Sequence, residues 1–256
     1  MAAVWRLILH PASEALWNMA VDEALLLSFA ESQVPVIRFY TWERPSISLG
    51  RFQNVEGSVN LERLADRGVP LVRRPTGGRA VLHGTDLTLS VVKANDRSSV
   101  SESYRGVAKA VAAALIELGA PVEIFSEESG RASMRSVANC FDLKARFEVA
   151  LEGRKVLGCA QLRTEQGILQ QNSLLMSLPN SEDTRILVDS IPCDESKALA
   201  DYAGNDAVTD AICHQIEQSM RVTLAPGALS DAEIRLANEL VASKYESPDW
   251  IERGSG

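Results

Sequence analysis

Three features are missing from the sequence, and each absence excludes a class of protein. No apolar run approaches the roughly 18 to 20 residues that a membrane-spanning helix requires, so we expect no membrane association. The N-terminus lacks the long hydrophobic region of a secretory signal peptide, which favours a cytoplasmic protein. The net charge of −8 is not the basic excess that phosphate binding requires, so nucleic acid is not expected as a main partner.

Metal-binding and nucleotide-binding motifs are missing as well. The four cysteines are Cys140, Cys159, Cys193 and Cys213. They include no CxxC pair and no spacing typical of zinc sites, which predicts reduced thiols and no metal site. Neither GxGxxG nor GxxxxGK[ST] occurs, so nucleotide binding by those routes is not supported.

The pattern of apolar residues predicts one α/β domain. The chain has 256 residues, 46% hydrophobic and 23% charged, and can bury a substantial core. We predict helices at 13–27, 60–67, 102–118, 183–189, 207–222 and 231–244, and strands at 36–40, 46–50, 69–72, 87–92, 122–125, 146–152, 154–163 and 168–176. This order favours an α/β (α+β) fold with a mixed, largely antiparallel central sheet flanked by helices. Within a single domain over 1–256, we expect a core at about 30–222 and a C-terminal helical extension at about 223–250.

A loop rich in arginine and glycine lies between two of the predicted strands. Its sequence over 73–84 is Arg-Arg-Pro-Thr-Gly-Gly-Arg-Ala-Val-Leu-His-Gly. Adjacent glycines let a ligand approach the backbone amides, and the flanking arginines supply positive charge with forked donors. A tight turn with solvated arginines is the simpler alternative. The composition favours a binding loop for an anionic or carbonyl-bearing ligand.

Two residues outside this loop suggest acyl transfer. Cys140 lies in a polar stretch, and Lys155 follows Gly153 at the start of a predicted strand. A structural thiol and a solvated hairpin lysine are the simpler interpretations. Taken with the glycine loop, however, a thiolate could act as the nucleophile, and a nearby ammonium could lower its pKa. Backbone amides and the lysine could then stabilise a tetrahedral oxyanion.

Four segments resemble the biotin/lipoate A/B protein ligase family. The loop at 73–83 and the Gly-Arg-Lys-Val-Leu-Gly segment at 153–158 look like the paired motifs of that family. Residues 17–25 and 244–250 resemble the beginning and the end of its lipoate branch. The resemblance covers almost the whole chain and implies a fold like that of class II aminoacyl-tRNA synthetases and biotin synthetase.

Within this family the chain is most similar to the cysteine-dependent octanoyltransferases. ATP-dependent lipoate ligases commonly have a third glycine and His-Asp in the loop, where this chain has Arg79 and His83-Gly84. They usually carry Asn-Asp before the lysine, where this chain has Phe147-Glu148. Cys140-Phe141-Asp142 is similar to the cysteine motif of the octanoyltransferases. The resemblance therefore implies no cofactor, whereas a ligase would need ATP and Mg²⁺.

The activity that this resemblance implies is a two-step transfer of an octanoyl group. Cys140 would take the group from acyl carrier protein as a thioester, and a lysine of a lipoyl-domain protein would attack that thioester. The acceptor would be a protein such as the glycine cleavage H protein or a 2-oxoacid dehydrogenase E2. An ATP-dependent lipoate-protein ligase and an amidotransferase between two lipoyl domains remain alternatives. We expect a monomer.

The resemblance also implies roles for individual residues. Lys155 would be the second catalytic residue, which holds the acyl carbonyl and helps to form the Cys140 thiolate. The expected substrate-binding residues are Arg73, Arg74, Thr76, Gly77, Gly78, Arg79, His83, Gly158 and Ala160. His83 is interpreted either as a proton shuttle or as a residue whose hydrogen bond stabilises the loop. Cys159 is interpreted as a small packing residue, because four residues along a strand separate it from Lys155 by roughly 13 Å.

Overall fold

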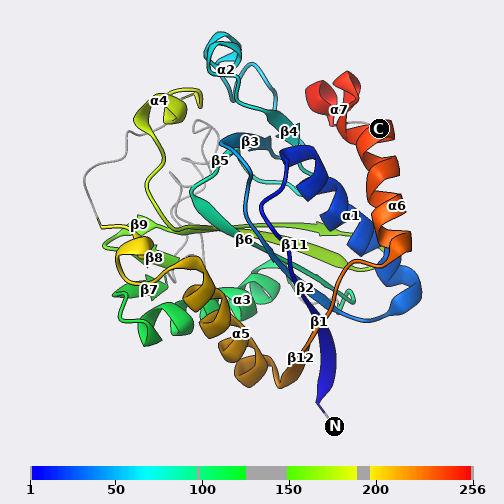
Figure 1. Ribbon diagram of the computed structural model, residues 1–256, viewed down its shortest axis with the longest axis vertical. Coiled ribbons are helices and arrows are strands. Elements are labelled where there is room, and N and C mark those ends of the chain that lie inside the picture. The colour runs from blue at the N-terminus through cyan, green and yellow to red at the C-terminus, as the bar shows by residue number, and fades with distance from the viewer. Residues whose placement is uncertain (1, 97–98, 125–148, 189–196, 255–256) are drawn as a thin grey trace.

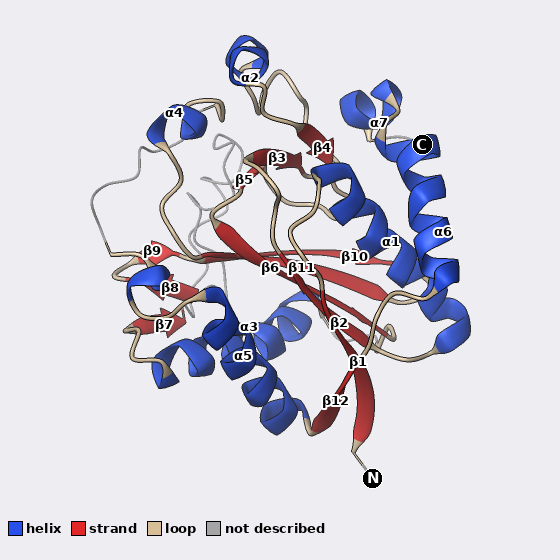
Figure 2. Cartoon of the chain, viewed as in Figure 1, coloured by secondary structure: helices blue, strands red, loops and turns tan. Residues whose placement is uncertain are grey.

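A six-stranded mixed sheet forms the centre of the computed structural model, which describes residues 2–96, 99–124, 149–188 and 197–254 (Figure 2). In sheet order the strands are β10 (Leu157–Arg163), β11 (Ile168–Leu175), β6 (Asp86–Lys93), β2 (Val36–Tyr40), β1 (Ala3–Leu9) and β12 (Val222–Pro226). The strands from β10 to β2 pair antiparallel, whereas β2, β1 and β12 pair parallel. The predicted mixed, largely antiparallel sheet is confirmed.

Two smaller sheets accompany the central one. β3 (Ser46–Leu49) pairs parallel with β4 (Leu71–Arg73) and antiparallel with β5 (Val81–His83). β8 (Val149–Leu151) pairs antiparallel with β7 (Val122–Ile124) and β9 (Arg154–Lys155). The stretch predicted as one loop at 73–84 therefore includes the end of β4 and all of β5, and only 74–80 connect the two strands. Lys155 lies at the end of β9.

Helices cover both faces of the central sheet (Figure 1). α1 (Ala15–Ser32) and α6 (Asp231–Leu240) lie on one face, and α3 (Val100–Glu117) and α5 (Asn205–Met220) pack together on the other. The shorter helical elements are α2 (Leu61–Arg67), α4 (Ser181–Thr184), the 3-10 turn η3 (Leu199–Asp201), the π-helical turn η4 (Val241–Tyr245) and α7 (Pro248–Arg253). None of the helices in the described ranges has the length and hydrophobicity of a membrane-spanning segment.

The strands distribute their side chains between the two helical layers, because successive side chains of a strand point to opposite faces. Ile37 and Phe39 of β2 join the apolar cluster of α3 and α5, whereas Val36 and Tyr40 join the cluster of α1 and α6. Arg38 shares the face of Val36 and Tyr40, so its guanidinium is directed towards α1, where it contacts Asn18 and Asp22.

Two strands lie outside the core limits of 30–222 that the sequence suggests. β1 precedes these limits, and β12 extends past them, yet both belong to the central sheet. The buried residues of β1, Trp5 and Ile8, are three apart and do not alternate as strand residues usually do. β12 ends at Pro226, and proline within an apolar run argues against a central strand. The segment expected to be a helical extension therefore begins with an edge strand.

The prediction of a helix at 183–189 is wrong. α4 ends at Thr184, and the chain then turns so that Leu187 forms an isolated β-bridge with Val59. The helix predicted at 231–244 is confirmed, with a π-helical last turn. Ser230 and Glu233 form the capping box at its start, because each side chain accepts a hydrogen bond from the other residue's backbone N–H.

Arg73 attaches the C-terminal helix α7 to β4. Its guanidinium donates to the carbonyls of Trp250 at 2.9 Å and Ile251 at 2.9 Å, and also to those of Gly50 and Gln53, each at 2.8 Å. The indole Nε1 of Trp250 donates to the Arg73 carbonyl at 2.9 Å. Cationic donors suit the unpaired carbonyls at the end of a helix. The fully buried Arg73 is therefore a structural residue, and the expectation that it binds substrate is not supported.

We predict that Trp250→Ala lowers the free energy of unfolding by about 3–5 kcal/mol, because removal of the buried indole creates a cavity and breaks the hydrogen bond to the Arg73 carbonyl. Chemical denaturation monitored by circular dichroism would measure this change. Phe52→Ala is the matched control, since Phe52 is 86% exposed. Its effect should stay within about 0.5 kcal/mol. Equal effects of the two substitutions would contradict the anchoring role of α7.

Candidate active site

One pocket lies where the central sheet meets the β3–β5 sheet. Its lining residues come from α1, the strands of both sheets and the loops that follow β2 and β4; they are Met19, Tyr40, Trp42, Ser48, Arg74, Val81, His83, Thr88, Gly158, Cys159, Ala160, Gln171, Asn172 and Ser173. The pocket is open to solvent on one side, and the space between these residues, solvent-open part included, is about 350 Å³. Four of the expected substrate-binding residues line it, namely Arg74, His83, Gly158 and Ala160.

Hydrogen bonds within the protein satisfy most of the polar groups in this wall. Ser173 Oγ donates to Asp86 Oδ2 at 2.6 Å, and Asn172 Nδ2 donates to the Leu89 carbonyl at 2.9 Å. Trp42 Nε1 donates to Thr88 Oγ1 at 2.9 Å. A polar group that is already paired offers little to a ligand, so the apolar side chains decide what the pocket accepts. The arrangement suits a flexible apolar chain with few polar atoms.

Arg74 holds the glycine loop in shape. Its guanidinium donates to the carbonyls of Ser48 at 3.0 Å, Gly77 at 2.7 Å and Arg79 at 2.6 Å. Gly78 has a φ of +89°, and a Cβ at this position would lie 2.9 Å from the Arg74 guanidinium. The loop is therefore a compact turn around Arg74, and Arg79 contributes its carbonyl to that turn.

The glycines allow the loop to pack closely on its neighbours. A Cβ on Gly50 would lie 1.9 Å from the Gly78 carbonyl oxygen, which no real structure tolerates without movement. A Cβ on Gly78 would lie 3.7 Å from the Ala160 side chain, so the loop runs beside β10. Gly77 and Gly78 do not themselves line the pocket. Their expected contact with an acyl chain remains a prediction.

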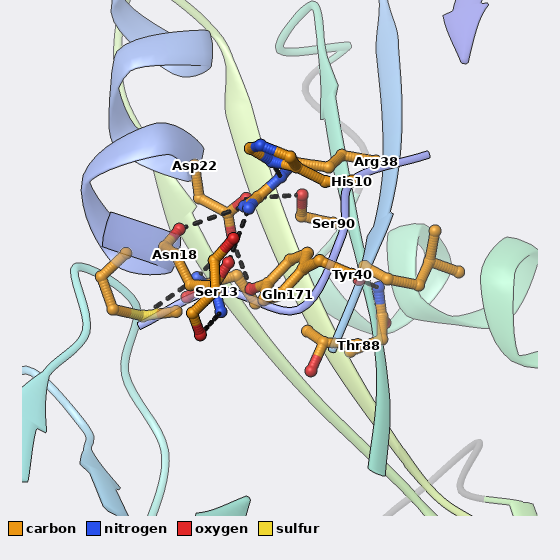
Figure 3. Close-up of polar contacts among 12 residues, drawn as sticks. His10, Ser13, Asn18, Asp22, Arg38, Tyr40, Thr88, Ser90 and Gln171 are labelled. Atoms are coloured by element: carbon orange, nitrogen blue, oxygen red, sulfur yellow. Dashed lines mark hydrogen bonds and ion pairs between the residues drawn. The ribbon is translucent and has the colours of Figure 1, made fainter. Parts of the chain in front are cut away.

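A buried network around Asp22 supports the pocket from the side of α1 (Figure 3). Asp22 Oδ1 accepts from Arg38 at 2.7 Å and from Ser90 Oγ at 2.7 Å. Oδ2 accepts from the Tyr40 hydroxyl at 2.8 Å and from Gln171 Nε2 at 2.7 Å. The Asp22 and Arg38 side chains are 0% exposed. Burial, followed by the Asp22 charge, raises the pKa of Tyr40 well above its usual value, so Tyr40 remains a donor.

The network reaches the glycine loop and the start of the chain. Thr76 Oγ1 donates to Gln171 Oε1 at 2.7 Å, so the expected ligand-binding Thr76 is a buried link to Asp22. At the other end, Arg38 Nε donates to His10 Nδ1 at 3.0 Å. Burial and then the Arg38 charge lower the pKa of His10 to about 4, so the imidazole is a neutral acceptor.

His83 lies between a hydroxyl and a carboxylate. Its Nε2 is 2.8 Å from Ser48 Oγ, and its Nδ1 is 2.7 Å from Asp86 Oδ2. Its ring stacks on Trp42, with 3.8 Å between the ring centroids. Gly84, with a φ of +117°, donates its N–H to Asp86 Oδ1 at 3.1 Å. Asp86, which follows Gly84 by two residues, thus supplies a carboxylate directly beside the histidine.

The other expected chemical residues have different outcomes. Cys140 lies outside the described residues. Lys155 is buried, so the alternative of a solvated hairpin lysine is wrong, while its catalytic role remains a prediction. Cys159 is half-buried and packs against the cluster of α3 and α5, as the packing interpretation expects, but it also lines the pocket. Cys213 lies on α5, where burial and then nearby carboxylates raise the pKa of its thiol to about 12.

Residues that sequence reasoning missed include Ser48, Trp42 and Asp86. Asp86, Thr88 and Ser90 alternate with Leu87, Leu89 and Val91 on β6. Polar residues at every second position of a buried strand are a sequence signal that could have indicated a polar wall. Among the described residues, no group of three or more His, Cys, Asp or Glu side chains is arranged to hold a metal ion.

We predict that Asp22→Asn destabilises the protein by about 3–5 kcal/mol, because it removes one partner of a buried ion pair. Urea denaturation at neutral pH would measure the change. Asp66→Asn on the exposed face of α2 is the control and should change stability by less than about 0.5 kcal/mol. An Asp22→Asn protein as stable as this control would show that the network does not support the fold.

A second prediction concerns Asp86 and pH. Burial acts to raise the pKa of Asp86, but the charge and hydrogen bond of His83, with Ser173 and the Gly84 amide, lower it overall. A carboxylate with a lowered pKa contributes stability above its unfolded-state pKa of about 3.9, and this contribution is lost as the pH falls through the folded-state value. The difference in unfolding free energy between the wild type and Asp86→Asn should therefore be largest at neutral pH. Denaturation across a pH series would contradict this if the difference grew towards acid.

Comparison with known proteins agrees with this architecture. The family model described as the lipoyl protein ligase A/B catalytic domain matches residues 14–221. The octanoyltransferase LipM of Moorella thermoacetica is 38% identical over 272 residues, covering 98% of this chain and 99% of that protein. The LipM protein of Brevibacillus brevis is 35% identical over 271 residues, covering 96% of this chain and 98% of that protein.

Solved structures show the same fold. A lipoate-protein ligase A bound with ATP has a TM-score of 0.85 at 24% identity, covering 98% of this chain and 99% of that one. The bipartite lipoate protein ligase of Thermoplasma acidophilum has a TM-score of 0.80 at 24% identity, covering 98% of this chain and 96% of that one. At this identity the likeness concerns the fold alone, and it confirms the predicted fold class. With the family match over most of its length and with full-length relatives above 30% identity, the chain belongs to the lipoyl protein ligase A/B catalytic domain family.

Proposed function

We propose that the protein is an octanoyltransferase that delivers an octanoyl group to a lysine of a lipoyl-domain protein. The observation that carries this proposal is the 38% identity to an octanoyltransferase LipM, with 98% of this chain and 99% of the relative covered. The octanoyltransferase predicted from the sequence is borne out by several such relatives, among them those of Moorella thermoacetica and Brevibacillus brevis.

The pocket has the character that an acyl chain needs. Met19, Trp42, Val81 and Ala160 give it apolar surface, and the polar groups of its wall are largely paired with one another. Burial of each methylene contributes about 0.8 kcal/mol, so an eight-carbon chain gains enough to be held without polar contacts along its length. Only the carbonyl end of the chain would need polar partners.

The chemistry that we propose proceeds through a thioester on the enzyme. The Cys140 thiolate attacks the thioester of octanoyl acyl carrier protein, the new C–S bond forms, and the carrier thiolate leaves. The amine of the acceptor lysine then attacks, forms the amide and releases Cys140. Thioester exchange is nearly thermoneutral and aminolysis is downhill, so the reaction needs no ATP. Lys155 would stabilise the oxyanion of the acyl carbonyl.

The choice of nucleophile can be tested among three of the four thiols, Cys140, Cys159 and Cys213. Cys213 is a poor candidate, because the thiolate is the reactive form and the pKa of its thiol is raised to about 12. Cys159 lines the pocket and is the competitor of Cys140. Replacement of each by serine removes one thiol at a time with little change in volume.

We predict that the wild type, mixed with octanoyl acyl carrier protein without ATP, gains the mass of one octanoyl group. Cys140→Ser should abolish this adduct and lower transfer to a lipoyl domain by at least about 10³-fold, as loss of a nucleophile does. Intact-protein mass spectrometry would measure the adduct, and a gel-shift or mass assay of the lipoyl domain would measure transfer.

Cys213→Ser is the matched control and should behave as the wild type. An adduct lost in Cys159→Ser but retained in Cys140→Ser would assign the nucleophile to Cys159. Transfer that requires ATP and free acid, and that Cys140→Ser leaves intact, would refute the proposed function.

A further inference from the structure

The Ser48, His83 and Asp86 side chains form a continuous hydrogen-bonded chain at the wall of the pocket. Ser48 Oγ lies 2.8 Å from His83 Nε2, and His83 Nδ1 lies 2.7 Å from Asp86 Oδ2. Ser48 and His83 both line the pocket, whereas Asp86 lies behind them and is 2% exposed. The proposed function assigns no role to these three hydrogen-bonded side chains.

The neighbours of Asp86 fix the direction of the hydrogen bonds. Oδ2 accepts from Ser173 Oγ at 2.6 Å and from Thr88 Oγ1 at 3.1 Å, while Oδ1 accepts from the Gly84 N–H at 3.1 Å. A carboxyl surrounded by donors is ionised, so His83 Nδ1 must carry a hydrogen and donate it to Asp86. In a neutral imidazole, Nε2 is then the atom with the free lone pair.

Arg74 fixes the orientation of the Ser48 hydroxyl. A guanidinium has only donors, and Arg74 Nη1 lies 3.1 Å from Ser48 Oγ, so Ser48 accepts there. The hydroxyl hydrogen of Ser48 is therefore available for His83 Nε2. The stacked ring of Trp42 and the hydrogen bond from Trp42 to Thr88 keep the imidazole in place. Among the described residues, the charged groups that face His83 are Asp86 and, through Ser48, Arg74.

The two half-reactions of acyl transfer differ in their need for a base. In the first, a thiolate enters and a thiolate leaves, so no proton has to move at the carbonyl. In the second, an amine attacks, and its nitrogen must lose a proton before the amide is formed. Only the second half-reaction therefore needs a proton acceptor in the pocket.

We propose that Ser48, His83 and Asp86 form a relay that accepts the proton of the acceptor lysine during amide formation. This inference rests on the proposed function, because it requires a lysine amine to enter the pocket. The N–C bond forms and the C–S bond breaks; the amine proton passes to Ser48 Oγ while the Ser48 hydrogen passes to His83 Nε2. The imidazolium, stabilised by Asp86, returns the proton to the leaving thiolate. Asp86 is a positioning residue, which fixes the tautomer and the orientation of the ring.

The test measures the two half-reactions separately in the full-length protein. Octanoyl acyl carrier protein first loads the enzyme, and the rise of octanoyl-enzyme is followed by rapid quench and mass spectrometry. An excess of a lipoyl domain is then added, and the appearance of the octanoylated domain is followed over time. The variants are His83→Gln and Ser48→Ala, with His214→Gln as control, since His214 is an exposed residue of α5.

We expect His83→Gln to slow amide formation by about 10²-fold or more while octanoyl-enzyme forms within about threefold of the wild-type rate. The loss should be confined to amide formation, because only that step uses the acceptor lone pair of His83 Nε2. Ser48→Ala keeps the His83–Asp86 bond and should show a smaller loss in the same step, and His214→Gln should show none.

A structural role for His83 would give a different result. An equal loss in both half-reactions would overturn the relay. If His83→Gln does not fold, as judged by circular dichroism, the same comparison is made with Ser48→Ala, and amide formation at the wild-type rate would overturn it. A wild-type protein that forms no octanoyl-enzyme would refute the octanoyl transfer, and this inference with it.

Discussion

The fully buried ion pair between Asp22 and Arg38 is the interaction on which the centre of this structure depends. Removing two charges from water costs several kcal/mol per ion unless hydrogen bonds satisfy the remaining valences. Here Tyr40, Ser90 and Gln171 satisfy the carboxylate, while Asn18 accepts from the guanidinium with both its backbone and its side-chain oxygen. Because these groups come from α1, β2, β6 and β11, their pairing specifies how the helix sits on the sheet.

The same pairing determines the chemical character of the pocket. Tyr40 and Gln171 line it, yet their polar atoms are directed to Asp22, and Gln171 also accepts from Thr76 of the glycine loop. A wall built in this way is polar in composition and apolar towards a ligand. It also makes the pocket hard to change, because a new polar contact with a ligand would leave an unpaired group in the network.

The sequence indicated the motifs of the site more fully than the residues to which those motifs hydrogen-bond. The glycine turn and the family were predictable, because they depend on residues adjacent in sequence, and the family match over residues 14–221 confirms the family assignment. The strand β5 at 81–83 was missed inside the predicted loop. The hydrogen bond between His83 and Ser48 was not predictable, because the two residues come together only through the antiparallel pairing of β3 and β5. Arg73 and Arg74 are indistinguishable in the sequence, yet one holds α7 and the other the glycine loop. The strands β1 and β12 were missed because β1 lacks alternating burial and β12 ends in proline, and their pairing with each other joins opposite ends of the chain.

The division between Arg73 and Arg74 also connects the C-terminal helix to the pocket. Adjacent residues at the end of a strand point to opposite sides, so one guanidinium reaches the carbonyls of α7 and the next reaches those of the glycine loop. Both arginines also contact β3: Arg74 donates to the Ser48 carbonyl, and Arg73 donates to the carbonyl of Gly50, which follows the strand. A displacement of α7 would therefore act on β4 and β3, and through Ser48 on the position of His83. The C-terminal helix, although it contributes no lining residue, belongs to the framework that fixes the geometry of the site.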